Sequence, residues 1–175
     1  MADLVEEYRD VLALRNLVDY PGLIDRAVGI ASDDDNRAQL RDRHRLVIVD
    51  EYQDTDAMQV RLLQEIAGDG AELIVVGDPD QSIYAFRGAD QREILNFTHT
   101  FAAAGKQPEV IALRNTRRFG ETIMKAAKRT LAGLPLPLGQ LSEHMLVHRN
   151  LNTLAEDPGR VVLQTYASPT AESEC

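Results

Sequence analysis

The sequence predicts an α/β fold in which a parallel β-sheet is flanked by helices. Three short runs are almost continuously apolar and rich in Val and Ile, as expected of parallel strands covered on both faces. They are RLVIV at 45–49, ELIVV at 72–76 and EVIAL at 109–113. Segments with helical spacing of apolar residues separate these runs, and such alternation indicates right-handed crossovers within one parallel sheet.

The first 44 residues predict a helical segment that leads into this core. One helix face would carry Leu4, Tyr8, Val11 and Leu12. Pro21-Gly22 is expected to interrupt this pattern before a second amphipathic stretch, residues 23–30. The acidic run DDDN at 33–36 is expected to be an exposed turn, because a run of like charges is usually solvated.

Three further helices are predicted from their apolar spacing. The first follows residues 45–49, with Thr55 or Asp56 as its N-cap. The apolar residues that mark the three are, in order, Met58, Leu62, Leu63 and Ile66; Ile94, Leu95, Phe97 and Phe101; and Ile123, Met124, Ala127 and Leu131. Residues 133–175 are expected to form a connection containing proline and glycine, then a strand, RVVLQTY at 160–166, that could open a second lobe.

Charge is distributed unevenly along the 175 residues, whose net charge is −9. Residues 1–80 hold eight basic and nineteen acidic residues, whereas residues 81–175 hold eleven and nine. Seven basic residues fall within 105–130, against Glu109 and Glu121. That local excess could meet phosphates. An ordinary solvated helix face is an equally good interpretation for Lys125, Lys128 and Arg129.

Nothing in the sequence predicts a membrane partner or a secretory route. No apolar run approaches the roughly 18 residues that a membrane-spanning helix needs. The start, MADLVEEYRD, lacks the basic and apolar regions of a signal peptide. The single cysteine, Cys175, permits no internal disulfide, so the reducing cytoplasm fits best.

Polar residues follow each of the first three predicted strands. Asp50-Glu51 follow the first, residues 77–81 (GDPDQ) the second and residues 114–118 (RNTRR) the third. The carboxyl ends of parallel strands share one sheet edge, where ligands bind, so these clusters should converge on one crevice. Acids, an amide and arginines suit a metal-bound polyphosphate.

An apolar strand that ends in Asp-Glu also has the Walker B pattern of nucleotide hydrolases. In that interpretation Asp50 holds Mg²⁺, directly or through water, and Glu51 orients and deprotonates the attacking water. Mg²⁺ typically takes one or two carboxylates and fills its shell with water and phosphate oxygens. Taken alone the pattern is weak, because such acids often simply begin a loop.

The pattern is accompanied by two longer motifs. DEYQDTD at 50–56, VVGDPDQSIYAFRGAD at 75–90 and LRNTRRFG at 113–120 resemble motifs II, III and IV of the UvrD/Rep-type superfamily 1 DNA helicases, in order. VDYPGLIDRA at 18–27 resembles the approach to motif II more weakly. The resemblance covers roughly residues 18–130. It implies a partial RecA-like (P-loop NTPase) sheet, with residues 45–132 as the latter part of the first lobe.

The resemblance also implies a role for each matching residue. Asp50 would be the Mg²⁺ ligand and Glu51 the general base, with Gln53 and Asp54 supporting the site by hydrogen bonds. Gln81 would sense the γ-phosphate of ATP and link it to the DNA groove. Arg117 would act as an arginine finger. Tyr84 and Phe86 would lie against single-stranded DNA, and Arg87 would add a phosphate or stacking contact.

Two positions depart from the usual family pattern. Phe86 stands where most relatives carry Trp, so stacking should persist over a smaller area. Thr116 stands where Tyr is common, and two arginines follow it, so either Arg117 or Arg118 could be the finger; alignment to Asn115 favours Arg117. Without the resemblance, Tyr84 and Phe86 would be equally well explained as core aromatics.

The sequence contains no phosphate-binding loop of the form G-x-x-x-x-G-K-[ST]. We therefore expect an internal fragment of an ATP-dependent DNA helicase or translocase, with the Walker A region and second lobe elsewhere in the parent chain. The parent would couple Mg-ATP hydrolysis to movement along single-stranded DNA, 3′ to 5′, in DNA repair or recombination. The fragment alone should be inactive. The alternative is a non-catalytic remnant that binds DNA or a partner.

Overall fold

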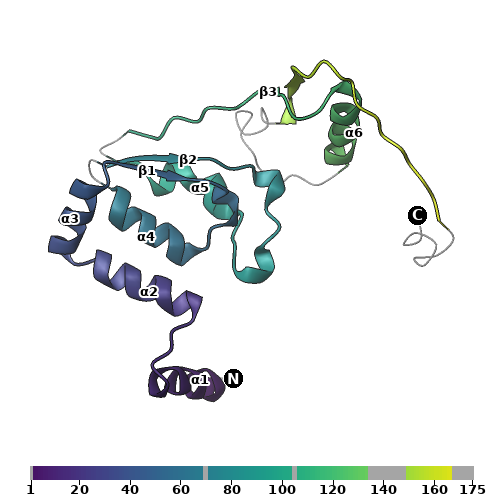
Figure 1. Cartoon of the computed structure of the whole chain (residues 1–175). Coiled ribbons are helices and arrows are strands. Elements are labelled where there is room, and N and C mark those ends of the chain that lie inside the picture. The colour runs from purple at the N-terminus through teal and green to yellow at the C-terminus, as the bar shows by residue number, and fades with distance from the viewer. Residues whose placement is uncertain (1, 69–70, 104–105, 134–148, 167–175) are drawn as a thin grey trace. The chain divides into compact units, whose positions relative to one another are not determined.

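The structure is a computed structural model that describes residues 2–68, 71–103, 106–133 and 149–166 (Figure 1). The chain divides into two compact units, Met1–Glu109 and Val110–Cys175. Each unit has its own short parallel sheet, and each is described by itself below. The described helices include none that is long and apolar enough to cross a membrane.

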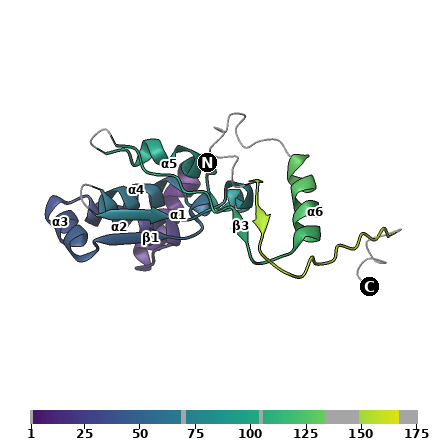
Figure 2. The ribbon, with the colours of Figure 1, turned by 90° about the horizontal axis from the view of Figure 1, so that it is seen from above.

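The first unit is built on a parallel pair of strands. Strand β1 (Leu46–Val49) and strand β2 (Glu72–Val75) run in register, with Leu46 opposite Glu72 and Val49 opposite Val75. Helix α4 (Ala57–Ala67) connects them and lies along one face of the pair, with helix α2 (Tyr20–Ala31) packed on its other side (Figures 1 and 2). The predicted strands at 45–49 and 72–76 and the helix between them are therefore confirmed.

The core of this unit lies between one face of the sheet and helices α4 and α5 (Arg92–Thr100). Its buried members are Tyr52, Val60 and Leu63. Half-buried side chains from both strands and both helices surround them: Val47, Val49, Ile66, Val75, Ile94, Phe97 and Phe101. Tyr52 packs edge-on against Phe97, with ring centroids 5.4 Å apart. Tyr52, the third residue of motif II, is thus buried at the centre of the core.

Helix α4 begins at a capping box. The Asp56 carboxylate accepts hydrogen bonds from the backbone N–H groups of Met58 (2.8 Å) and Gln59 (2.9 Å), and the Gln59 side chain accepts one from the Asp56 N–H (3.0 Å). Of the two predicted N-cap residues, Asp56 is therefore correct. The Thr55 hydroxyl instead donates to the carbonyl of Tyr52 at 2.7 Å. Both residues thereby fix the turn between the motif and the helix.

Three helices precede β1, of which the first two were predicted and the third was not. They are α1 (Ala2–Leu14), α2 and α3 (Asp34–Arg43). Pro21-Gly22 does not interrupt a helix but lies in the first turn of α2, where proline loses no hydrogen bond. The run at 33–36 is not a turn either. Asp33 caps α3 and the next acids occupy its first turn, where negative charge is favourable.

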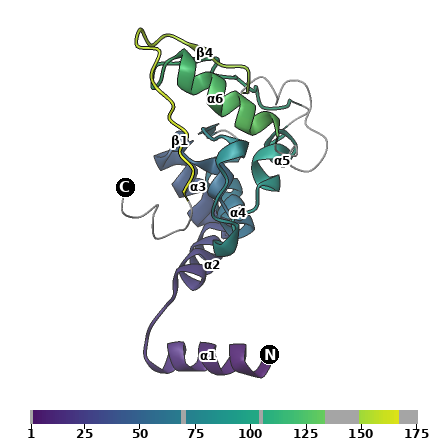
Figure 3. The ribbon, with the colours of Figure 1, turned by 90° about the vertical axis from the view of Figure 1, so that its right-hand side faces the viewer.

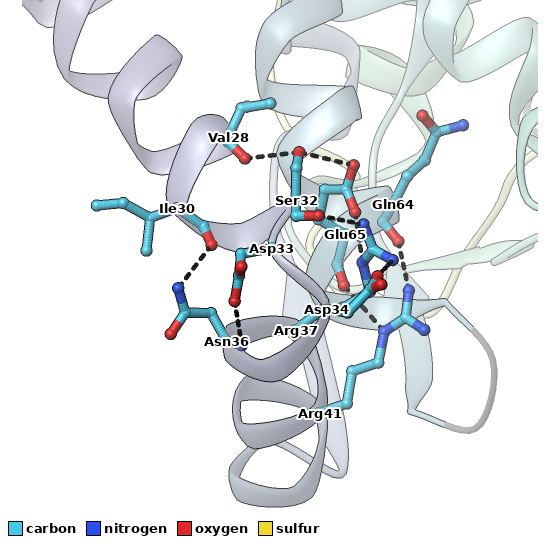
Figure 4. A network of polar contacts seen from close by, with 10 residues as sticks. All are labelled: Val28, Ile30, Ser32, Asp33, Asp34, Asn36, Arg37, Arg41, Gln64 and Glu65. Carbon is cyan, nitrogen blue, oxygen red and sulfur yellow. Dashed lines mark hydrogen bonds and ion pairs between the residues drawn. The ribbon is translucent and has the colours of Figure 1, made fainter.

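Helix α3 is attached by polar contacts, because it buries no residue of its own. Arg37 donates to a Glu65 carboxylate oxygen on α4 at 2.7 Å and to the Ser32 carbonyl at 2.8 Å. Arg41 donates to the carbonyls of Gln64 and Glu65 at the end of α4. Figure 4 shows the two arginines reaching from α3 to these acceptors. Two side chains on successive turns thus hold α3 against α4.

The described part of the second unit contains helix α6 (Glu121–Ala132) and two short parallel strands, β3 (Asn115–Thr116) and β4 (Asn152–Thr153) (Figures 2 and 3). Lys128 on α6 donates to the Leu151 carbonyl at 2.8 Å. Gly120 precedes α6 in close contact with residues 157–158, where an added Cβ would lie 1.8 Å from the Asp157 carbonyl oxygen. Only glycine fits there without moving the backbone.

Two predicted strands are wrong. Residues 109–113 and 160–166 form no strand in the structure. A strand requires a neighbouring backbone to pair with, and none of the described segments lies in register with either run. Their apolar side chains remain exposed, with Ile111 73 % and Leu163 93 % accessible. Much of the predicted connection, residues 134–148, and the end of the chain lie outside the described residues.

We expect Tyr52→Phe to fold at least as stably as the wild type. The ring is fully buried, and its hydroxyl meets no hydrogen-bond partner among the described residues. Burial raises the pKa of this phenol far above its usual value, and the charge of Glu93 adds to the effect. Tyr52→Ala should instead cost about 3–5 kcal/mol. Urea unfolding measures both, and a loss above about 1 kcal/mol in Tyr52→Phe would contradict the unpaired hydroxyl.

Arg37→Met should lower the free energy of unfolding by about 1–3 kcal/mol, because the half-buried Glu65 carboxylate loses its cation. The side chains of Arg37 and Glu65 are 28 % and 17 % exposed. Arg61→Met on the exposed side of α4 is the matched control. Urea unfolding at low and high salt is the measurement. Equal losses in the two variants would show that Arg37 contributes only its charge.

Candidate functional site

The two acids of motif II project from the carboxyl end of β1. The chain turns sharply there, with Glu51 in the left-handed region at φ 52° and ψ 42°. This conformation is uncommon for a residue other than glycine. The Glu51 N–H donates to an Asp50 carboxylate oxygen at 2.9 Å, and the Tyr52 N–H donates to the Val76 carbonyl at 2.9 Å. The turn leaves Asp50 and Glu51 exposed and sends Tyr52 into the core.

The carboxylate of Asp50 has the exposure and chemistry that a Mg²⁺ ligand requires. Its Oδ1 is occupied by the Glu51 N–H, whereas no described residue donates to its Oδ2. An exposed carboxylate with a free oxygen suits an ion that takes one or two carboxylates and completes its shell with water and phosphate oxygens. The described residues form no group of three or more acidic, histidine or cysteine side chains able to enclose a metal.

Gln53 is buried directly behind the acids and connects two loops. The residue as a whole is only 1 % exposed. The amide nitrogen donates to a Glu51 carboxylate oxygen at 2.6 Å and lies 3.5 Å from an Asp54 carboxylate oxygen. The amide oxygen accepts from the Asp78 N–H at 3.1 Å. Gln53 therefore contacts both the turn after β1 and the loop after β2.

The loop after β2 is shaped by Asp78. Its carboxylate accepts from the Asp80 N–H at 2.9 Å and from the Gln81 side-chain amide at 2.7 Å. A short 3-10 turn, Pro79–Gln81, follows, and the Ser82 hydroxyl donates to the Gln53 carbonyl at 3.2 Å. Gln81 is exposed at the same sheet edge as the motif II acids. Two of the three predicted clusters are thus brought together by hydrogen bonds.

The third cluster lies in the second unit. Arg117 and Arg118 are both exposed, between β3 and α6. Thr116 is half-buried, and its hydroxyl accepts from the Arg118 N–H at 3.2 Å, so it organises the backbone of this turn. Convergence of Arg117 with Asp50 and Gln81 stays a prediction, as does the choice between the two arginines.

The predicted DNA-contacting residues form an exposed aromatic cluster in the first unit. Tyr84 is 36 % and Phe86 78 % exposed, and the chain between them opens a 3-10 turn, Ala85–Arg87. The Arg87 guanidinium lies 4.9 Å from the centre of the Tyr84 ring and 5.6 Å from that of Phe86. Neither ring is part of the hydrophobic core around Tyr52. The cluster presents aromatic faces and a positive charge to its surroundings.

Sequence reasoning gave no role to Asp78, Ser82 or Gly77. A Cβ on Gly77 would lie 2.7 Å from the Gln53 amide oxygen and 2.8 Å from a methyl carbon of Ile94. The glycine therefore permits the close approach of Gln53. A signal was present in the sequence: Gly-Asp-Pro after a strand is typical of a turn whose Asp caps the next residues.

Comparisons with known proteins show the family to which the chain belongs. A family profile, the UvrD/REP helicase N-terminal domain, matches residues 1–102. The chain is 39 % identical over 140 residues to ATP-dependent DNA helicase UvrD1 of Mycobacterium tuberculosis, covering 75 % of this chain and 18 % of the relative. It is 32 % identical over 170 residues to UvrD2 of the same organism, covering 87 % and 23 %.

A third relative is ATP-dependent DNA helicase Rep of Salmonella typhimurium, 34 % identical over 126 residues, which cover 72 % of this chain and 17 % of that protein. The chain thus spans about a fifth of the length of the curated relatives it matches. The profile covers more than half of the chain, including motifs II and III. On these matches and on its motifs, the chain belongs to the UvrD/REP helicase family.

Proposed function

We propose that this chain is part of an ATP-dependent DNA helicase or translocase and supplies half of its ATP site. One observation carries the proposal: hydrogen bonds through Gln53 join the loop bearing Glu51 to the loop bearing Gln81. The second loop continues directly into the exposed cluster of Tyr84, Phe86 and Arg87. Groups suited to ATP hydrolysis and groups suited to DNA binding therefore share one short segment.

In the proposed mechanism, Glu51 accepts the proton of the attacking water and Asp50 holds Mg²⁺. When bound, Mg²⁺ neutralises charge on the phosphate oxygens. Gln53 and Asp54 support the base from behind, and Gln81 presents its amide to the γ-phosphate. Arg117, or Arg118 beside it, supplies positive charge to the transferred phosphoryl group. ATP, Mg²⁺ and single-stranded DNA are thus the proposed ligands.

Three further features of the proposed function are supported by the family resemblance. They are movement in the 3′ to 5′ direction along DNA, a role in DNA repair or recombination, and a cytoplasmic location. The same holds for residues 1–44 as a helical segment, 45–132 as part of the first lobe and 133–175 as the connection to a second lobe. The proposed partner of the ATP site is the remainder of a parent chain, which contributes the phosphate-binding loop.

The alternative is a non-catalytic polypeptide that binds DNA or a partner. It is favoured by the lack of a phosphate-binding loop in the sequence, because a lysine and a backbone cradle for the β- and γ-phosphates are then missing. We expect the 175-residue chain alone to hydrolyse ATP at background rate. Both proposals share this expectation, so a protein that joins this segment to a phosphate-binding loop is needed to separate them.

Glu51→Gln in a protein that joins this segment to a phosphate-binding loop should retain ATP binding and lower the ATPase kcat at least about a hundredfold. The substitution removes the base and keeps the shape of the side chain. Glu72→Gln is the matched control, because Glu72 begins β2 and so lies at the other end of that strand from the site. Its ATPase kcat should equal that of the wild type. Steady-state ATPase with single-stranded DNA is the measurement. Full activity of Glu51→Gln would overturn the assignment of the base.

Phe86→Ala should weaken binding of an oligo-dT strand to the same protein by about five- to 150-fold, because a base–aromatic stack contributes about 1–3 kcal/mol. Phe86→Trp should strengthen it by enlarging the stacking face. Ile83→Ala is the control, since Ile83 is exposed beside the cluster but has no aromatic face. Fluorescence anisotropy gives the Kd values. An equal loss in Phe86→Ala and Ile83→Ala would argue against stacking.

A further inference from the structure

Among the described residues, Gln53 has a side chain that hydrogen-bonds to both loops of the proposed ATP site. It is 1 % exposed, so its amide has no access to water and depends on its protein partners. These lie on opposite sides: the Glu51 carboxylate at 2.6 Å and the Asp78 N–H at 3.1 Å. Asp78 lies 25 residues from Gln53 in the sequence, whereas Glu51 lies two residues from it.

The chemistry of the partners fixes the orientation of this amide. A carboxylate can only accept a hydrogen bond, and a backbone N–H can only donate one. A rotation that exchanged the amide nitrogen and oxygen would set the oxygen against the carboxylates of Glu51 and Asp54. It would also set an N–H against that of Asp78. Gln53 therefore has one stable arrangement, in which Glu51 and Asp78 are held at a fixed separation.

From Asp78 the contacts continue toward the aromatic cluster. The Asp78 carboxylate accepts from the Gln81 side chain at 2.7 Å, and the Gln53 carbonyl accepts from the Ser82 hydroxyl at 3.2 Å. The next residues are those of the exposed cluster, Tyr84 to Arg87. A displacement of this segment by a bound strand would move Asp78 and Ser82, and both hydrogen-bond to Gln53.

At its other end, Gln53 holds a residue in a strained conformation. Glu51 has φ 52°, which a residue with a side chain adopts at a cost. Its carboxylate is exposed and accepts a hydrogen bond from the Gln53 side-chain amide. A shift of the Gln53 amide thus changes directly where the carboxylate of the proposed base is held.

We propose that Gln53 is a positioning residue that couples occupancy of the DNA-contacting segment to the orientation of Glu51. The inference rests on the proposed function, because Glu51 must be the base for its orientation to matter. In this arrangement the Asp78 loop moves with the bound strand, and the buried amide passes that movement to the carboxylate. Gln53 itself touches neither nucleotide nor DNA.

The first test is structural and uses the 175-residue chain. Gln53→Met keeps the length of the side chain but removes both ends of the link. Hydrogen exchange at the Asp78 amide, followed by NMR, should accelerate about tenfold or more. Gln64→Met is the matched control, because Gln64 is exposed and its amide, among the described residues, donates to the Thr100 carbonyl at 3.4 Å. Unchanged protection of Asp78 in Gln53→Met would overturn the link.

The second test is functional and uses the protein with a phosphate-binding loop. Gln53→Met should reduce the stimulation of ATPase by single-stranded DNA, measured as the ratio of stimulated to basal kcat, to less than about a third of the wild-type ratio, with KM for ATP within about twofold of wild type. A merely structural role would change basal and stimulated rates together. Stimulation equal to that of the wild type would overturn the coupling.

A second variant guards against misfolding of Gln53→Met. Gly77→Ala keeps glutamine at position 53 but sets a Cβ 2.7 Å from its amide oxygen, so the amide must shift and the variant should give the same loss of stimulation. Thermal unfolding by circular dichroism checks that each variant is folded. If the wild type itself shows no DNA-stimulated ATPase, the proposed function fails and the coupling with it. If the wild type is stimulated and both variants are too, the coupling alone fails.

Discussion

The burial of Tyr52 is the constraint on which the proposed site depends. The side chain is fully enclosed by residues of the sheet, α4 and α5, and it lies only three residues after the end of β1. To bring it inward so soon, the chain must reverse at Glu51, which takes a left-handed conformation. Asp50 and Glu51 then remain outside. The acidic tip of an apolar strand is thus held in place by an aromatic anchor behind it.

Different forces attach the different layers of the first unit. The strands, α4 and α5 share a hydrophobic core, whereas α3 buries nothing and is attached by Arg37 and Arg41. Arg41 donates to carbonyls in the last turn of α4, where backbone acceptors lack partners within the helix. This places a positive charge at the negative end of the helix dipole. Helix α3 therefore stabilises α4 as well as being held by it.

What the sequence could predict was local. Apolar spacing located β1, β2, α4, α5 and α6, and the cap at Asp56 is a contact within four residues. The prediction of strands at 109–113 and 160–166 was wrong, because a strand must pair with a segment that is distant in the sequence, and no local pattern shows whether such a partner exists. The same is true of the site. Motif resemblance led to the proposal of Glu51 and Gln81 as site residues, but it did not predict the hydrogen bond between Gln53 and Asp78, which are 25 residues apart.

The residue type at position 53 follows from the contacts of its side chain with both loops. Its neighbours demand a donor toward two carboxylates and an acceptor toward a backbone N–H, from a side chain with no access to water. Glutamate would place a third acid beside Glu51 and Asp54, and methionine would leave the Asp78 N–H unpaired. Asparagine has the right groups but lacks one methylene of reach. A buried primary amide of this length satisfies both loops at once, and the glycine at 77 leaves it the space to do so.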